Sequence, residues 1–355
     1  MNKITVLIIT LCSVAVCFAQ NIQVKRNDFY VAGESNIRLF VREVKDTDTK
    51  QNRTPVLLLH GARVPGVASF DLPVAGGSLA ADLASGGYTV YVMDARGYGK
   101  STRPAEMLQP PEANLPLVRS AEVVSDINAV VEAICKRNKV EKVALFGWAT
   151  GGHWFGFYAS LHPNRVSHLI FDNSLYGATP AHPTLGKGSN LENPEQKGTF
   201  NVKAFGAYRL NTAESLISSW NNSIALADKS QWRDASIVAA YQQAAMDSDS
   251  TAKSRTPNTF RSPTGALEDS FYLAIGRGFW DASLIKARTL ILRSEKDFWS
   301  RPEDVERLKE HLIYAKEVRA VTIPNATHFV HLDRAERGRE LFLKEIINFL
   351  SPKPN

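Results

Sequence analysis

Short runs of apolar residues without a polar face recur along the chain and predict buried β-strands. The first covers residues 55–60 and reads Pro-Val-Leu-Leu-Leu-His, a pattern typical of parallel strands that helices cover on both faces. Runs of the same type follow at 88–93, 143–146, 166–171, 289–292 and 318–323. Ahead of them, residues 29–31 and 36–44 predict a leading antiparallel hairpin.

Segments with helical periodicity alternate with these strands. The clearest is 120–137, where Val123, Ile127, Val130 and Ile134 recur at spacings of three and four and form one apolar face. Further helical patterns cover residues 78–85, 150–161, 302–315 and 335–350. Strands and helices in alternation predict an α/β fold with a doubly wound, mostly parallel sheet and right-handed crossovers.

One interval, residues 173–285, breaks this alternation. It contains many aromatic residues, several short helical patterns and turn-rich stretches, but no buried-strand run. A structureless loop of this length is uncommon inside a compact domain. We therefore expect an inserted, mostly helical cap at 173–285, with residues 20–172 and 286–355 forming the α/β core. The total length of 355 residues is enough for such a domain with its insertion.

The N-terminus predicts a secretory signal peptide at residues 1–19. Lys3 precedes an apolar stretch at 4–16, and Ala19 marks the expected cleavage site. The stretch is short for a membrane span, so we expect export to the periplasm or the medium and no stable membrane insertion. A lipoprotein anchored at Cys17 is a less favoured alternative, because a bulky residue precedes that cysteine. Cleavage would leave Cys135 alone, without an intramolecular disulfide.

Composition narrows the expected partners to small molecules. The formal net charge is +6, but no run of Lys or Arg gathers it into a patch, so no nucleic-acid partner is expected. The histidines show no metal-ligand spacing, and no dinucleotide-binding glycine loop is present. We therefore expect no metal and no cofactor. The sequence leaves the oligomeric state open.

The segment 143–154, Val-Ala-Leu-Phe-Gly-Trp-Ala-Thr-Gly-Gly-His-Trp, predicts a strand, a sharp turn and a helix. Small residues flank position 149, as they flank the nucleophile in the Gly-x-Ser-x-Gly elbow of serine hydrolases. The central residue here is Ala149, whose methyl group cannot attack a carbonyl carbon. Shifting the frame to make Thr150 the nucleophile would put Trp148 where the first glycine is needed.

Four other turns that follow predicted strands carry candidate chemistry, at the carboxyl ends of the strands, where open α/β sheets place their sites. Three of them are His-Gly-Ala-Arg at 60–63, Asp-Ala-Arg-Gly-Tyr-Gly-Lys-Ser at 94–101, and an acidic turn that ends at Asp297. A fourth, Ile-Pro-Asn-Ala-Thr-His, ends at His328. Together with the elbow, and in this order, the turns resemble those of the α/β-hydrolase superfamily over essentially the whole mature chain.

The resemblance implies a role for each turn. Asp297 would orient His328, and the backbone amides of Ala62 and Thr150 would form an oxyanion hole. Ala149 would occupy the nucleophile position of a catalytic triad that lacks its hydroxyl. His331 is a competitor for His328, but it lies beyond the loop and is expected to pack or to be solvated.

The 94–101 segment is expected to be structural, with Asp94 and Arg96 tying the loop by ion pairing and hydrogen bonds.

The missing hydroxyl permits three interpretations. The chain is an inactivated form of an exported esterase or lactonase, or a general-base enzyme in which Asp297 and His328 act on water or on a substrate proton. Alternatively, it is a ligand-binding protein in which His328 is dispensable. The intact acid, histidine and oxyanion loop favour a hydrolase-type enzyme acting on a small or medium apolar ester or lactone. Aromatic candidates for substrate binding are Trp148, Phe271 and Trp280, with core packing as the alternative for each.

Overall fold

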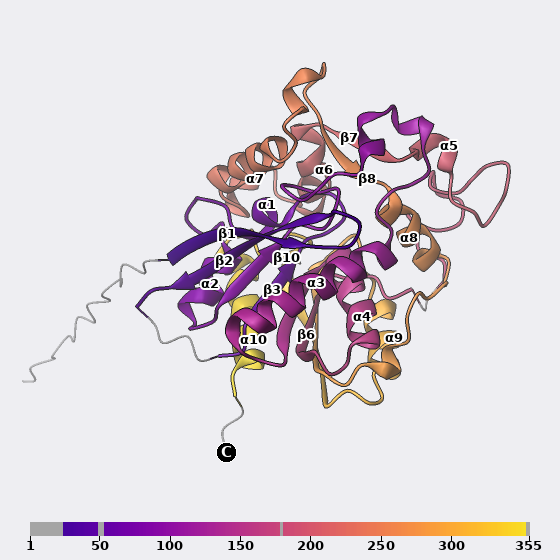
Figure 1. Cartoon of the computed structure of the whole chain (residues 1–355). Helices are drawn as coiled ribbons and strands as arrows, with labels where there is room; N and C mark the ends of the chain where they lie inside the picture. Colours follow the sequence, from indigo (N-terminus) through magenta and orange to yellow (C-terminus); the bar gives the residue numbers. More distant parts are fainter. Residues whose placement is uncertain (1–23, 49–52, 178–179, 353–355) are drawn as a thin grey trace, which may run out of the picture.

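The computed structural model describes residues 24–48, 53–177 and 180–352 (Figure 1). The predicted signal peptide at 1–19 lies outside these residues, so export stays a prediction. Among the described helices, none is both long and apolar enough to cross a membrane.

An eight-stranded sheet forms the centre of the molecule, in the order β1-β2-β4-β3-β5-β6-β9-β10. Its strands are β1 (Val24–Ala32), β2 (Arg38–Asp46), β3 (Val56–Leu59), β4 (Val90–Met93), β5 (Val143–Trp148), β6 (Val166–Asp172), β9 (Arg288–Lys296) and β10 (Glu317–Thr327). β2 is antiparallel to β1 and to β4, and all other neighbours are parallel. The predicted α/β fold class, with its mostly parallel sheet and leading hairpin, is confirmed.

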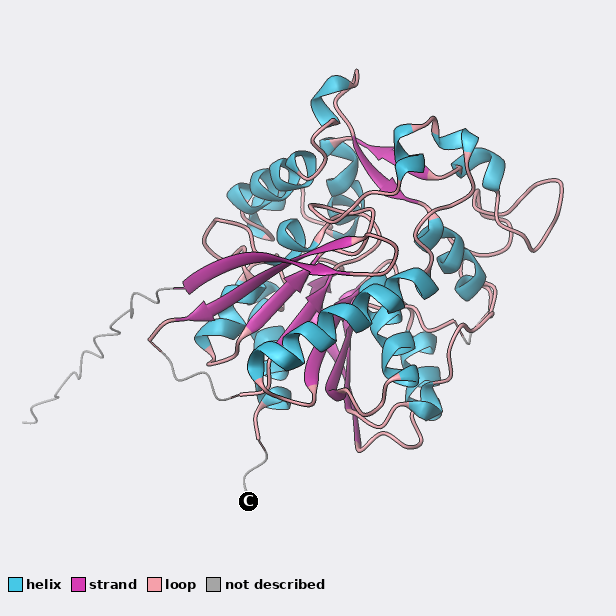
Figure 2. Ribbon diagram, viewed as in Figure 1, coloured by secondary structure: helices cyan, strands magenta, loops and turns pink. Residues whose placement is uncertain are grey.

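Helices cover both faces of this sheet (Figure 2). On one face lie α1 (Gly66–Phe70), α2 (Leu79–Ser85) and α10 (Arg339–Leu350); on the other lie α3 (Ser120–Asn138), α4 (Thr150–Leu161) and α9 (Pro302–His311). The short α1 was not predicted, and α10 begins four residues later than its pattern suggested. The later start has a local cause, because Gly338 has a φ of 102° and ends the preceding turn.

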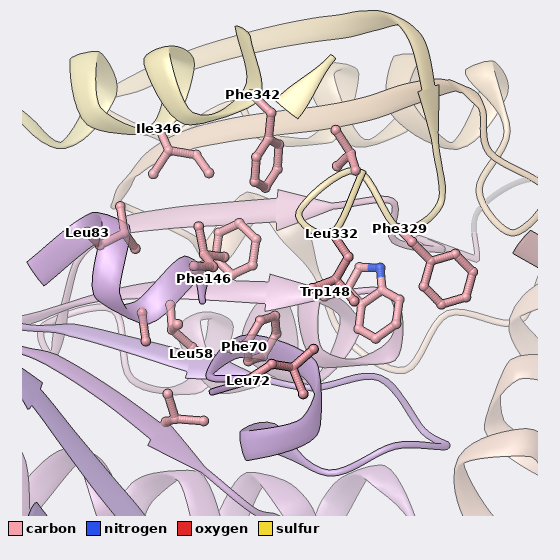
Figure 3. Packing of buried hydrophobic residues seen from close by; sticks show 14 of the residues in the cluster. Leu58, Phe70, Leu72, Leu83, Phe146, Trp148, Phe329, Leu332, Phe342 and Ile346 are labelled. Atoms are coloured by element: carbon pink, nitrogen blue, oxygen red, sulfur yellow. The ribbon is translucent and has the colours of Figure 1, made fainter. Parts of the chain in front are cut away.

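The central strands are apolar on both faces because both faces are packed. In β3, Val56 and Leu58 contact the cluster under α1, α2 and α10, whereas Leu57 and Leu59 contact the cluster under α3 and α4. Figure 3 shows the first cluster, where Leu58 and other side chains lie between the sheet and the helices. Complete burial of each such side chain contributes roughly 1.5–3 kcal/mol, so this packing holds the turns at the strand ends in place.

Residues 173–285 stand between β6 and β9 in the chain. They hold α5 (Val202–Phe205), β7 (Tyr208–Asn211), α6 (Ala213–Ser223), α7 (Ala235–Asp247), β8 (Phe260–Pro263) and α8 (Gly265–Ala274). The expectation of a mostly helical insertion missed the antiparallel pair of β7 and β8. Each of these strands has four residues and mixes polar with apolar side chains, so neither gives a periodic signal.

Candidate active site

The turn between β5 and α4 has the tight geometry that its sequence predicts. Ala149 has φ 51° and ψ −118°, a conformation that residues other than glycine rarely adopt. Its N–H donates to the carbonyl of Asp172 at 2.8 Å, and its own carbonyl accepts from the Ser174 hydroxyl at 2.8 Å. A Cβ atom at Gly147 would lie 2.4 Å from the backbone of Gly151. The bend therefore excludes a side chain at position 147, and at position 151 a Cβ atom would lie 2.2 Å from the carbonyl oxygen of Leu59.

His328 and Asp297 meet next to this turn, although they are 31 residues apart in the chain. Nδ1 of His328 lies 2.6 Å from Oδ1 of Asp297, and both side chains are buried. The other carboxylate oxygen accepts from the backbone N–H of Ser300 at 2.8 Å and from its hydroxyl at 2.5 Å. An ionised carboxylate only accepts, so Nδ1 carries the hydrogen and Nε2 is left as the basic nitrogen.

Two side chains fix the backbone of His328. The indole N–H of Trp148 donates to the His328 carbonyl at 2.9 Å, and the Asn173 side-chain amide donates to the same oxygen at 3.2 Å. The ring of Trp148 also lies against the His328 ring, with centroids 5.1 Å apart. In Figure 3, Trp148 projects from the sheet toward the loop that carries Phe329 and Leu332. Trp148, predicted to bind substrate, therefore positions the histidine as well as lining the pocket.

The loop after β3 is held by His60. The backbone N–H of Ala95 donates to Nε2 of His60 at 3.2 Å, so Nδ1–H donates to the carbonyl of Gly61 at 2.7 Å. Burial lowers the pKa of His60 to about 4, which keeps its ring neutral and its tautomer fixed. This arrangement orients the Gly61–Ala62 peptide at the end of β3.

The amides predicted for the oxyanion hole border the same pocket. Ala62 and Thr150 line it together with Ala149, Trp148 and His328. Thr150 is the first residue of α4, so its N–H is one of those that a helix leaves without an intrahelical acceptor. All five predicted residues at this pocket therefore come together, from the ends of β3, β5 and β10.

This pocket, which we call the elbow pocket, has a volume of about 150 Å³. Its walls come from the core and from residues 173–285, and the residues that line it are Gly61, Ala62, Arg63, Val64, Trp148, Ala149, Thr150, Arg209, Leu216, Ser219, Tyr241, Phe298, Trp299, His328 and Phe329. A larger surface hollow of about 760 Å³ lies beside Asp71, Asp82 and Asp94, and none of the predicted catalytic residues lines it.

Two residues predicted to bind substrate do not line the elbow pocket. Phe271 is completely buried on α8 and packs against Phe200 and Tyr272. Trp280 stacks on Phe171 at a centroid distance of 6.2 Å and donates its indole N–H to His153. Both aromatic rings are packing residues, which was the stated alternative. His331 is also buried, where its ring contacts Trp148.

Asp94 and Arg96 stabilise the 94–101 turn by hydrogen bonds and an ion pair, each with partners of its own. Asp94 accepts backbone N–H groups of Gly66 at 2.7 Å and Lys100 at 2.9 Å. Arg96 instead forms a bidentate pair with Asp126 of α3, with the closest contact at 2.6 Å. The partner on a distant helix could not be identified from local spacing.

A second cluster of serine, histidine and aspartate lies elsewhere and was not anticipated. We call Ser120, His153 and Asp269 the sealed cluster, because each is at most 4% exposed. The Ser120 hydroxyl donates to Asp269 at 2.6 Å and lies 3.1 Å from Nε2 of His153. The Trp280 indole donates to Nδ1 of His153, so Nε2 carries the hydrogen and cannot remove the serine proton. This connectivity does not create a nucleophile.

Asp172, at the end of β6, is another buried group without a sequence signal. Neither of its carboxylate oxygens has a hydrogen-bond partner among the described residues. Burial, and then the negative charge of Asp297, raise its pKa well above the ordinary value. The surroundings of Asp172 therefore disfavour its charged form.

Sequence reasoning also missed the two arginines of the elbow pocket. Arg63 directly follows the predicted oxyanion loop, and that adjacency was the one available signal. Arg209 belongs to β7, and only the folding of residues 173–285 brings it to the pocket.

Comparisons with known proteins agree with this geometry. A sequence profile described as alpha/beta hydrolase fold matches residues 54–335. An esterase from Exiguobacterium antarcticum superposes with a TM-score of 0.55 at 16% identity, covering 91% of this chain and 99% of that chain. A thermophilic esterase from Thermogutta terrifontis gives a TM-score of 0.56 at 16% identity, with coverages of 92% and 100%.

A bromoperoxidase from Bacillus anthracis is similar to the same extent, with a TM-score of 0.56, 17% identity and coverages of 91% and 99%. At such identities the likeness establishes the fold alone, and the reaction has to be argued from the site. A search of curated proteins found no match.

Proposed function

The chain belongs to the α/β-hydrolase fold family, and from this premise we propose that it hydrolyses a small or medium ester or lactone without forming an acyl-enzyme. The observation that carries the proposal is the 2.6 Å contact between Asp297 and His328 at a pocket that Ala149 also lines. The contact between the acid and the histidine, and the presence of Ala62 and Thr150 in the pocket wall, support the proposal, and position 149 carries no hydroxyl.

Water replaces that hydroxyl in the proposed reaction. Nε2 of His328 accepts a proton from a water molecule whose oxygen attacks the substrate carbonyl, and the carbonyl π electrons move onto its oxygen. The amides of Ala62 and Thr150 stabilise the resulting oxyanion. When the intermediate collapses, the leaving alkoxide takes the proton back from His328. Asp297 stabilises the transient imidazolium throughout.

The expected rate is modest. Removing the nucleophile of a serine hydrolase costs roughly a million-fold in turnover, while about a thousand-fold acceleration over water remains from the rest of the site. Labile esters and strained lactones are therefore the substrates on which activity should be measurable. The walls provided by Leu216, Phe298 and Phe329 favour an apolar body in the substrate.

Turnover of a panel of short-chain esters and lactones tests this proposal. We expect the chain to exceed the buffer rate on at least one labile member and His328→Ala to be slower than the chain on that substrate. His162→Ala, on the turn that ends α4, is the matched control and should keep the activity. Equal rates for the chain and His328→Ala on every substrate would rule out the general-base reaction.

Ala149 itself favours a second candidate, a ligand-binding protein on a hydrolase frame. Such a protein would bind an ester analogue with similar affinity in its original form and as His328→Ala, and neither would turn over any substrate. Isothermal titration beside the turnover panel therefore separates the two functions.

A further inference from the structure

Two positively charged side chains face the elbow pocket, one from each half of its wall. Arg63 comes from the loop after β3, and Arg209 comes from β7 in the inserted region. Arg63 donates to the Asn211 side-chain oxygen at 2.9 Å and to the Ser215 hydroxyl at 2.7 Å. Arg209 donates to the carbonyl of Ala62 at 3.1 Å. All of these acceptors are neutral.

No carboxylate neutralises either guanidinium within the described ranges, and no acidic residue lines the elbow pocket. Two buried arginines elsewhere do have an acid partner: Arg96 contacts Asp126 at 2.6 Å, and Arg261 contacts Asp249 at 2.8 Å. The contrast matters because a buried charge without a counter-charge is destabilising.

The two pocket arginines also repel each other. Burial, and then the positive charge of Arg63, lower the pKa of Arg209 to about 10, so it stays charged at neutral pH. The Nε atom of Arg209 is buried without an acceptor in the described structure. That donor is closed off from the pocket, so the charge is what points to a ligand: two guanidinium groups without a counter-charge at the pocket wall indicate a site for an anion that arrives with the ligand.

The position of this site relative to the proposed chemistry follows from Ala62. Its carbonyl accepts from Arg209, and its amide is the proposed oxyanion donor on the same residue. A ligand group at the arginines would therefore lie next to the reacting carbonyl.

We propose that the ligand of the elbow pocket carries an oxyanion group, a carboxylate or a phosphate, which the guanidinium groups of Arg63 and Arg209 bind. The inference rests on the proposed function of this pocket and refines its substrate class: an ester or lactone with an apolar body and one acidic substituent. The planar guanidinium fork matches both kinds of oxyanion, so the shared chemistry rather than one compound is assigned.

Calorimetric binding of three probes tests the inference without relying on turnover. The probes are monomethyl glutarate, which is anionic, dimethyl glutarate, which is its neutral match, and inorganic phosphate. We expect the unsubstituted chain to bind at least one anionic probe about tenfold or more tightly than the neutral diester, since hydrogen bonds to charged groups are the stronger ones. The affinity should decrease as ionic strength rises. Whichever of monomethyl glutarate and phosphate binds more tightly shows whether the site prefers a carboxylate or a phosphate.

Substitutions locate the binding groups. Arg63→Met and Arg209→Met should each weaken the anionic probe about ten- to hundredfold and leave dimethyl glutarate unchanged. Arg165→Met is the matched control. Arg165 pairs with Glu132 and precedes the amino end of β6, whereas the pocket lies at the carboxyl ends of the strands. The substitution removes the same charge and should leave all three affinities unchanged. Circular dichroism checks that each variant is folded.

The comparison of probes on the unsubstituted chain keeps the inference testable even if an arginine variant does not fold. Equal affinities for the anionic and neutral probes would overturn it, as would an anionic affinity that neither arginine substitution changes. Turnover of neutral esters without anion binding would contradict this inference and leave the proposed function standing. Anion binding that depends on the arginines, without any turnover, would contradict the proposed function and leave this inference standing.

Discussion

The elbow pocket and the sealed cluster each use a histidine and an aspartate, but they differ in their hydroxyl group, their hydrogen bonds and their access to substrate. The pocket has His328 bonded to Asp297 and facing a cavity, but Ala149 provides no hydroxyl. The sealed cluster has the hydroxyl of Ser120, but its aspartate bonds the serine instead of the histidine. The difference shows that a serine, a histidine and an aspartate do not make a nucleophile. The order of their hydrogen bonds and access to substrate do.

Restoring the hydroxyl in the elbow pocket should give the largest effect. Ala149→Ser should react covalently with a fluorophosphonate probe, whereas the parent chain should not, a difference that reaches roughly a million-fold for loss of a triad nucleophile. Intact-protein mass spectrometry measures the labelling. Adding Ser120→Ala should leave it unchanged. Labelling that Ser120→Ala abolishes would instead place the reactive serine in the sealed cluster.

The second largest difference should appear when the aspartate of each region is replaced by asparagine. In the Ala149→Ser background, Asp297→Asn should slow labelling by about ten-thousand-fold, because an amide no longer holds His328 in the required tautomer. Asp269→Asn is the matched substitution in the sealed cluster and should change the labelling rate little. Time courses with the same probe compare them. Equal losses for the two variants would show that the regions are coupled.

The sealed cluster should matter for stability instead. Ser120→Ala removes a donor from the buried carboxylate of Asp269 and should lower the free energy of unfolding by about 1–3 kcal/mol. Urea denaturation measures this change. Ser218→Ala, at an exposed position of α6, is the control and should stay within about 0.5 kcal/mol. A loss no larger than the control would mean that the Ser120 hydroxyl contributes nothing to folding.

The most gradual expected effect is a pH dependence that the sealed cluster introduces. Burial lowers the pKa of His153 from 6.5 to about 3, so the unfolded chain binds a proton that the folded chain does not between these values. Stability should therefore fall as pH decreases below 6.5, by up to about 1.4 kcal/mol per pH unit from this residue. His153→Asn should have a shallower slope in denaturation measured across this range. Parallel slopes would show that His153 does not contribute.

Local pattern was sufficient for the fold, and the resemblance of the turns to those of α/β hydrolases supplied the catalytic candidates. Uninterrupted apolar runs predicted the parallel strands, and the resemblance assigned roles to Ala149, Asp297 and His328 in the turns that follow them. This worked because the carboxyl ends of parallel strands lie at the same end of the sheet, so the topology alone brings the turns that follow them together. The glycines around Ala149 added a local steric requirement that the sequence displays directly.

Only the tertiary structure decided which side chains face the pocket and which partners they meet. The sequence suggested that Phe271 and Trp280 bind a ligand, but long-range packing buries Phe271 and sets the half-buried Trp280 against Phe171. Arg209 has no local signal and reaches the pocket only because β7 pairs with β8, about fifty residues later in the chain. Hydrophobic periodicity predicts which side chains of a helix or strand are buried, because one face of that element is turned away from solvent. The partner it meets depends on how separate elements pack, and no local pattern encodes that.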